Sequence, residues 1–209
     1  MKKIYKSIFF LVAACFVGFS YSGAYFSSSV LISGNGITTA KPLKPGKIVI
    51  SEVYYDVSPD KGSEPNDEWI ELYNSGDMAL SIKDWKIIDN GATRTIHSNI
   101  SIPPHGIVLV SKDHSVWNNY NNIPNNVTYV ELGQNIGNGL SNSGDLITIK
   151  DQNESIIDQM SYGTNTTIFN PSCADVEEGY SLERSPASQD TDLASDFINQ
   201  KIPTPGVVL

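Results

Sequence analysis

The sequence predicts an all-β protein that folds as a sandwich of short strands. Val, Ile, Thr and Tyr dominate the segments between turn residues, and these residue types favour strands. The segments follow one another at the short spacing of a β-sandwich, and the only stretch that resembles a helix is the apolar leader. With 209 residues, 40% of them hydrophobic, the chain can form one core and one ordinary domain.

Residues 1–24 predict a secretory signal peptide, with a basic start, an apolar centre from Ile8 to Phe19 and a cleavage site after Ala24. Two alternatives stay open. The apolar run is long enough to be kept as an N-terminal membrane anchor, and a lipobox-like segment could make Cys15 a lipidated N-terminus. In each case the rest of the chain is expected outside the membrane, secreted or at the cell surface.

Residues 25–46 are rich in Ser, Gly, Thr and Pro and predict a flexible linker. Removal of the leader takes away three of the 14 basic residues and none of the 23 acidic ones, which leaves a formal charge of −12. Binding to nucleic acid needs clustered Lys and Arg, so we expect no nucleic-acid partner. A membrane partner is expected only through an uncleaved leader.

The clearest strand lies at 68–74, where Ile70 and Leu72 alternate with Trp69, Glu71 and Tyr73. This period of two predicts a half-buried strand. Glu71 then lies on the face of Trp69 and Tyr73, and that face is expected to be an amphipathic surface or a binding face.

The other strands are expected on both sides of this one. The predicted set is 47–55, 68–74, 79–89, 93–97, 107–111, 127–131, 145–150 and 155–162, with a tight hairpin at Asn90–Gly91. These strands form a β-sandwich over residues 47–163. Residues 117–126 predict a long surface loop, and 164–209 a C-terminal segment that wraps back on the same domain, with one helical turn near 193–198.

Several motifs in this order resemble the lamin-tail domain family. They are the opening strand Ile50–Val53, the segment Glu68–Asn74 (EWIELYN), the Trp-containing strand Trp85–Asp89, the turn before Ile107, and the segments Leu140–Leu146 (LSNSGDL) and Asp158–Gly163 (DQMSYG). The closing segments Ser181–Arg184 and Phe197–Gly206 are also similar to that family.

The resemblance implies an immunoglobulin-like β-sandwich of the type found in secreted bacterial proteins, with no enzymatic activity of its own. Six residues of these motifs are expected to be structural: Glu68, Ile70, Leu72, Asn74, Trp85 and Asp89. Glu68 is expected to accept amide hydrogens from a loop. The leader separately resembles that of the camelysin and TasA group of secreted proteins, which is consistent with cleavage after Ala24.

An acidic loop is the strongest candidate for a metal site. Asp56, Asp60, Glu64 and Asp67 supply oxygen ligands around Gly62, as calcium prefers, although the spacing departs from an EF-hand. A solvated loop without metal is the competing interpretation. No other cofactor is expected.

Loops at the ends of sandwiches often carry recognition, so Trp117 and Tyr120 are the candidate ligand-binding residues, for a protein or a carbohydrate at the cell surface. The alternative role for Trp117 is an anchor that packs its loop on the core. The sequence thus predicts a non-catalytic binding or scaffolding module. A structural subunit of an extracellular layer or fibre and a metal-dependent hydrolase stay open as alternatives. After cleavage Cys173 is the only cysteine, expected to be buried or simply tolerated.

Overall fold

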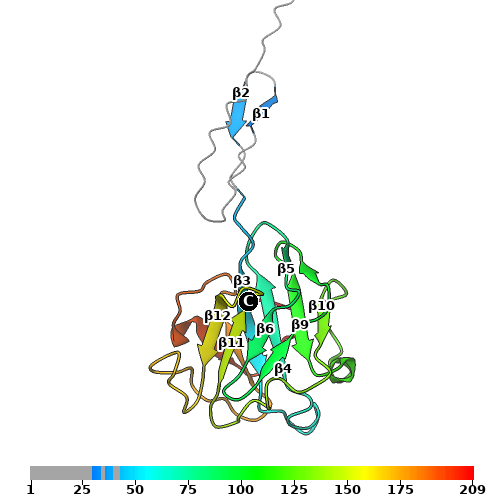
Figure 1. Cartoon of the computed structure of the whole chain (residues 1–209), viewed down its shortest axis with the longest axis vertical. Coiled ribbons are helices and arrows are strands. Elements are labelled where there is room, and N and C mark those ends of the chain that lie inside the picture. Colours follow the sequence, from blue (N-terminus) through cyan, green and yellow to red (C-terminus); the bar gives the residue numbers. More distant parts are fainter. Residues whose placement is uncertain (1–29, 34–35, 40–42) are drawn as a thin grey trace, which may run out of the picture.

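The computed structural model describes residues 30–33, 36–39 and 43–209. Two β-sheets pack face to face in it (Figure 1). The larger sheet has six strands in the order β10-β9-β4-β3-β13-β14, and the smaller has four in the order β12-β11-β6-β7. Neighbouring strands are antiparallel except for β9 and β10, which are parallel. The predicted leader, residues 1–24, lies outside the described residues.

The elements have the following bounds. The six-stranded sheet contains β3 (Ile48–Tyr54), β4 (Trp69–Asn74), β9 (Ile107–Ser111), β10 (Thr128–Glu131), β13 (Ser181–Arg184) and β14 (Phe197–Gln200). The four-stranded sheet contains β6 (Lys86–Ile88), β7 (Thr93–Thr95), β11 (Leu146–Lys150) and β12 (Ile156–Ser161). Two small pairs are β1 (Val30–Ser33) with β2 (Gly36–Thr39), and β5 (Leu80–Ser81) with β8 (Ser101–Ile102). The two 3-10 helices are η1 (His114–Asn119) and η2 (Ala194–Asp196).

The predicted strands correspond to β3 to β7 and β9 to β12, with two differences. The expected strand 79–89 is divided into β5 and β6, because the chain turns at Asp84, where φ is 61°. The predicted linker 25–46 is not free of regular structure, since β1 and β2 pair within it. Its Val, Ile and Thr residues have the β-branched side chains that favour strands.

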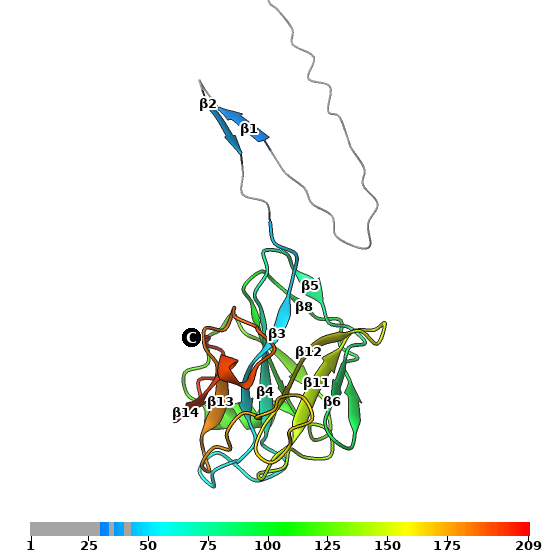
Figure 2. The same cartoon turned by 90° about the vertical axis from the view of Figure 1, so that its left-hand side faces the viewer.

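The C-terminal residues are part of the large sheet. β13 pairs with β3 and β14 pairs with β13, so both strands extend the sheet beyond β3 (Figure 2). Where one helical turn is predicted near 193–198, the chain forms η2 and then enters β14. The expectation that residues 164–209 wrap back on the domain therefore understates their role, because they supply two strands of it.

The main core lies between the two sheets. Ile70 and Leu72 of β4 are fully buried in it, and Trp85 reaches it from the chain just before β6. Burial of each such aliphatic side chain contributes about 1.5–3 kcal/mol. Cys173 is also buried in this core as a free thiol, and burial raises its pKa to about 12. Ile70, Leu72 and Trp85, for which structural roles are expected, thus all lie in the core.

The outer face of the large sheet is covered as well, which the sequence pattern does not predict. All seven residues of β3 are buried, and Trp69 and Glu71 of β4 have no exposed surface. A second hydrophobic cluster with η1 covers Trp69, and residues 200–206 cover Glu71. The expectation that the Glu71 face is an amphipathic surface is therefore wrong. Alternation within one strand cannot reveal that a distant segment packs on its polar side.

Candidate functional site

The acidic loop after β3 brings two of its four predicted ligands together. The Asn142 side-chain amide donates to Asp56 Oδ1 at 3.2 Å and to both oxygens of Glu64 at 2.9 Å. Burial, followed by the negative charge of Glu64, raises the pKa of Asp56 to about 6. One side-chain amide thus bridges the two carboxyl groups.

The other two predicted ligands point elsewhere. Asp60 accepts a hydrogen bond from Ser58 Oγ at 2.7 Å, and Asp67 accepts one from the Ser63 backbone at 2.8 Å. Over the described part of the chain, no group of three or more His, Cys, Asp or Glu residues is placed to hold a metal ion. The four-residue calcium site predicted from the sequence is therefore not formed, because local hydrogen bonds turn the carboxylates in different directions.

Glu68 has the structural role that the sequence predicts. Its side chain is buried, and Oε2 accepts the Leu140 backbone amide at 3.0 Å. Burial is the main cause that raises the pKa of Glu68 to about 8. Within the described residues, Oε1 has no hydrogen-bond partner. A neutral Glu68 thus fastens the loop that precedes β11 to the start of β4.

Asn74 and Asp89 also fasten loops. Asn74 Nδ2 donates to the carbonyls of Met78, Ile102 and Pro103 at 2.8 to 3.1 Å. The carboxylate of Asp89 accepts backbone amides from its own turn, at Gly91 and Ala92, and from Asn138 of another loop, all at 2.7–2.8 Å. Both residues are buried. Their side chains form hydrogen bonds with backbone groups of irregular segments, which lack the regular backbone pairing of a sheet. Both side chains thus hold irregular segments in place.

The predicted ligand-binding aromatics belong to the second hydrophobic cluster. Residues 117–119 lie in η1, which begins after Asp113 with its carboxylate accepting the Ser115 amide at 2.9 Å. Trp117 is only 5% exposed, and its ring lies 5.9 Å from that of Trp69. Tyr120 is half-buried, and its hydroxyl accepts the Trp69 indole hydrogen at 2.8 Å. Trp117 is thus the anchor that packs its loop on the core and not an exposed binding residue, while ligand binding by Tyr120 stays a prediction.

A groove of about 420 Å³ lies at the other end of the sandwich. Its apolar lining includes Ile48, Trp85 and Ile156, and its polar lining includes Lys47, Asp151 and Gln152. The Trp85 indole donates to Gln152 Oε1 at 3.0 Å, and its ring is almost fully buried below the groove. Ile156, in contrast, is 56% exposed. The sequence pattern does not identify this groove, because its walls come from three separate segments, 46–48, 80–85 and 151–157.

Two buried clusters of charged side chains also escape the sequence pattern. On the outer face of the large sheet, Glu52, Glu71 and Glu183 lie on three neighbouring strands. On the inner face, Arg184 is buried among three aspartates: Asp158, Asp190 and Asp196. In the sequence, the only sign of these clusters is that charged residues occur within segments that resemble strands. Whether those charged side chains are buried depends on the C-terminal residues that pack on them. No helix in the described residues has the length and apolar character needed to cross a membrane.

Comparison with known families agrees with this architecture. A search of curated proteins finds no significant match to the chain. The family model described as Lamin Tail Domain matches residues 42–164, which is more than half of the 209 residues. The match spans β3 to β12, whereas β13 and β14 lie beyond it. The chain therefore belongs to the lamin tail domain family, and its fold is the immunoglobulin-like β-sandwich that the sequence resemblance predicts.

Proposed function

We propose that this protein is a secreted or cell-surface module that binds another protein without catalysis. The observation that carries the proposal is the groove beside Ile156. Apolar and polar residues line it together, and Ile156 leaves more than half of its surface in water. An exposed apolar side chain next to a groove is a frequent feature of contact surfaces. The apolar leader in residues 1–24 supports export to the cell surface.

The groove favours a protein partner over a carbohydrate. A sugar ring usually stacks on an exposed aromatic face, but the ring of Trp85 is only 3% exposed. An apolar side chain from a partner could instead contact Ile156 and Leu80 at the groove wall. Lys47 and Asp151 at the rim could bind polar groups of the same partner.

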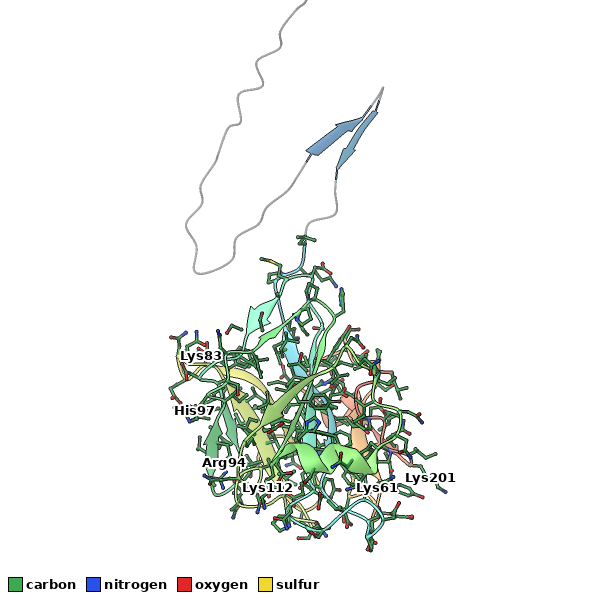
Figure 3. All side chains as sticks on the ribbon, turned by 90° about the vertical axis from the view of Figure 1, so that its right-hand side faces the viewer. Lys61, Lys83, Arg94, His97, Lys112 and Lys201 are labelled. Atoms are coloured by element: carbon green, nitrogen blue, oxygen red, sulfur yellow. The ribbon has the colours of Figure 1, made fainter. Side chains whose placement is uncertain are left out.

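Nucleic acid is not the expected partner. In Figure 3 the side chains of Lys83, His97 and Arg94 lie along the left margin of the sandwich. Those of Lys112, Lys61 and Lys201 lie along its lower part. Arg94 is also occupied, since its guanidinium donates to the carbonyls of Asn135 and Gly137. Cations spread in this way do not form the continuous positive surface that follows a phosphate backbone.

The test compares the full chain with its Ile156→Lys variant in capture from surface extracts of the source organism. Ile156 is exposed, so the substitution is expected to leave the fold intact. The variant should lose at least about 10-fold in capture of a defined protein. Ile202→Lys is the matched control, because Ile202 is 74% exposed and does not line the groove. Equal capture by all three chains, or binding only on a glycan array, would contradict the proposal.

A structural subunit of an extracellular layer or fibre is the second candidate. It is favoured by β14, an edge strand of the large sheet, where Ile198 is 42% exposed. Exposed edges can pair with another chain. Sedimentation of the full chain over a wide range of concentration would show assembly, and Ile198→Lys should abolish it.

A further inference from the structure

Three buried glutamates form a continuous row across the large sheet. In the strand register, Glu183 of β13 lies opposite Glu52 of β3, and Glu52 lies opposite Glu71 of β4. The three residues are at most 1% exposed. Side chains directly opposite in antiparallel strands have Cβ atoms about 5 Å apart, and like charges at such positions destabilise a sheet. The row would therefore be costly if all three carboxyl groups were ionised.

The bulge in β3 contributes to this arrangement. The register with β4 shifts between Ile50 and Glu52, so Ser51 is the extra residue. Its hydroxyl donates to Glu71 Oε1 at 2.6 Å. The hydroxyl of Ser181 likewise donates to Glu52 Oε1. The sheet itself thus supplies one donor to each of two glutamates.

The remaining donors come from residues 200–209, which we call the C-terminal strap. Thr204 N donates to Glu52 at 3.1 Å, and Gly206 N donates to Glu71 at 2.7 Å. The side chain of Gln200 donates to Glu183 at 2.7 Å, and that of Thr204 lies 3.4 Å from the same oxygen. The strap therefore touches all three members of the row. It covers the row by these hydrogen bonds and not by an ion pair.

The groups that face the row carry no positive charge among the described contacts. Leu109 of β9 lies opposite Glu71, and Gln200 and Thr204 of the strap are neutral. Burial chiefly raises the pKa of the Tyr120 phenol, and the charge of Glu52 adds to this effect. Lys201 of the strap lies over the Tyr180 ring, and Arg184 binds the aspartates on the inner face of the sheet.

Two oxygens of the row, Glu52 Oε2 and Glu183 Oε1, are buried without a hydrogen-bond partner among the described residues. An unpaired carboxylate oxygen is expensive to bury, whereas a neutral carboxyl group is much less so. We propose that the C-terminal strap is a pH-sensitive latch, which is closed over the glutamate row while the row is protonated and loosens as the row ionises.

The direction of titration agrees with this geometry. Burial is the largest cause that raises the pKa of Glu52, Glu71 and Glu183, and for Glu71 it reaches about 7. A carboxyl group with a raised pKa in the closed state stabilises that state fully below its ordinary pKa of 4.5. This stabilisation is lost as the pH rises through about 7. The latch therefore closes in acid and loosens in mildly alkaline solution.

Backbone hydrogen exchange of the full chain, read by mass spectrometry, tests the latch. After correction for the intrinsic exchange rate, protection of peptides that cover residues 200–209 should fall about 10-fold or more between about pH 5.5 and about pH 8.5. Peptides from β11 serve as an internal reference and should keep their protection. Constant protection of the strap over this range would overturn the proposal.

Substitution by glutamine separates ionisation from packing. Glu71→Gln and Glu183→Gln each keep the shape and one acceptor oxygen but cannot ionise, so the fall in strap protection should shrink several-fold. Two variants are used so that the test can still be made if one of them does not fold. Glu177→Gln is the matched control, because Glu177 is exposed and makes no contact with the row. If the folded glutamine variants lose strap protection with pH as steeply as the natural chain, the row does not operate the latch.

Discussion

Two consecutive residues of β13 hold the C-terminal part of the chain in opposite ways. Arg184 points into the sandwich, where its guanidinium lies 2.9 Å from Asp158 and 3.4 Å from Asp196 and donates to the Ile50 carbonyl at 2.8 Å. Glu183 points to the outer face, where its neighbours are Glu52 and the strap. In the first cluster one guanidinium offsets part of the negative charge of three aspartates, and burial still raises the pKa of Asp158 to about 6. The other can lower its charge only by taking up protons.

The two clusters respond differently to pH, as Asp196 of η2 and Glu52 of β3 show. Burial opposes ionisation of Asp196, but hydrogen bonds from Thr191 and its other neighbours outweigh it and hold its pKa below the usual range. Glu52 has hydrogen bonds too, yet burial prevails and its pKa is raised. The balance therefore favours the ionised form of Asp196, next to Arg184, and the neutral form of Glu52 in a row of like groups.

The largest effect is expected from removal of the positive charge on the inner side. Arg184→Met leaves Asp158 and Asp196 buried without a cation and should lower the free energy of unfolding by about 3–5 kcal/mol. Urea denaturation measures the change. Arg94→Met is the control, because Arg94 donates to backbone carbonyls and its loss should cost about 1–2 kcal/mol. Equal losses of stability in the two variants would show that the buried ion pairs of Arg184 contribute no more than the hydrogen bonds of Arg94.

The next effect has the opposite sign. Glu71→Gln should raise the free energy of unfolding by about 2–3 kcal/mol near pH 8, because the natural side chain is then ionised in a buried row. The advantage should disappear below pH 4.5, where Glu71 is protonated in the folded and unfolded states alike. Urea titrations at a series of pH values test this. A variant that is less stable than the natural chain at every pH would contradict the interpretation that the glutamate row is buried without a compensating positive charge.

A smaller effect is expected where the strap packs against the loop that precedes β10. Gly206 has a φ of 89°, and an added Cβ would lie 2.8 Å from Val127 Cγ2 and 2.9 Å from Pro124 Cδ. Gly206→Ala should therefore lower the free energy of unfolding by about 2 kcal/mol. Gly133 has a φ of 68°, and no atom lies within 4 Å of an added Cβ. Gly133→Ala therefore measures the backbone strain alone and should cost about 1 kcal/mol. Identical thermal denaturation of the two variants would mean that the strap does not pack tightly.

The smallest effect is expected at the rim of the Arg184 cluster. Lys47 lies 2.9 Å from Asp190, but its side chain is 51% exposed. Lys47→Ala should change the free energy of unfolding by less than about 0.5 kcal/mol. Asp190→Ala should cost more, about 1 kcal/mol, because Asp190 also lies 3.3 Å from the buried Arg184. Urea denaturation of both variants would show whether charge compensation depends on burial as the comparison requires.

Much of the fold could be predicted from local patterns. The alternation of Ile70 and Leu72 with polar and aromatic neighbours correctly identified β4 and its core face. The role of Glu68 as an acceptor for a loop amide was also predictable, since a carboxylate beside core residues must find donors. β13 and β14 were not identified as strands, because polar residues interrupt the hydrophobic pattern of both segments, SLER and FINQ.

The candidate sites were harder to predict. The acidic loop is rich in carboxylates, but side-chain direction is set by local hydrogen bonds such as that from Ser63 to Asp67. Trp117 resembles an exposed loop residue in sequence, whereas contact with Trp69 places it in a core. The groove beside Ile156 depends on β5, β6 and β12 meeting the start of β3. Each of these outcomes depends on contacts between segments that are distant in sequence.

The sequence by itself determined the all-β class, the alternation that builds the main core and the membership of the lamin tail domain family. These properties follow from residue types and spacings that act within one strand or turn. Only the tertiary structure decided which charges are buried and with which partners. Glu183 and Arg184 are adjacent in the chain, yet they lie on opposite faces of the sheet, and the cost of burying a charge depends on the segments packed around it.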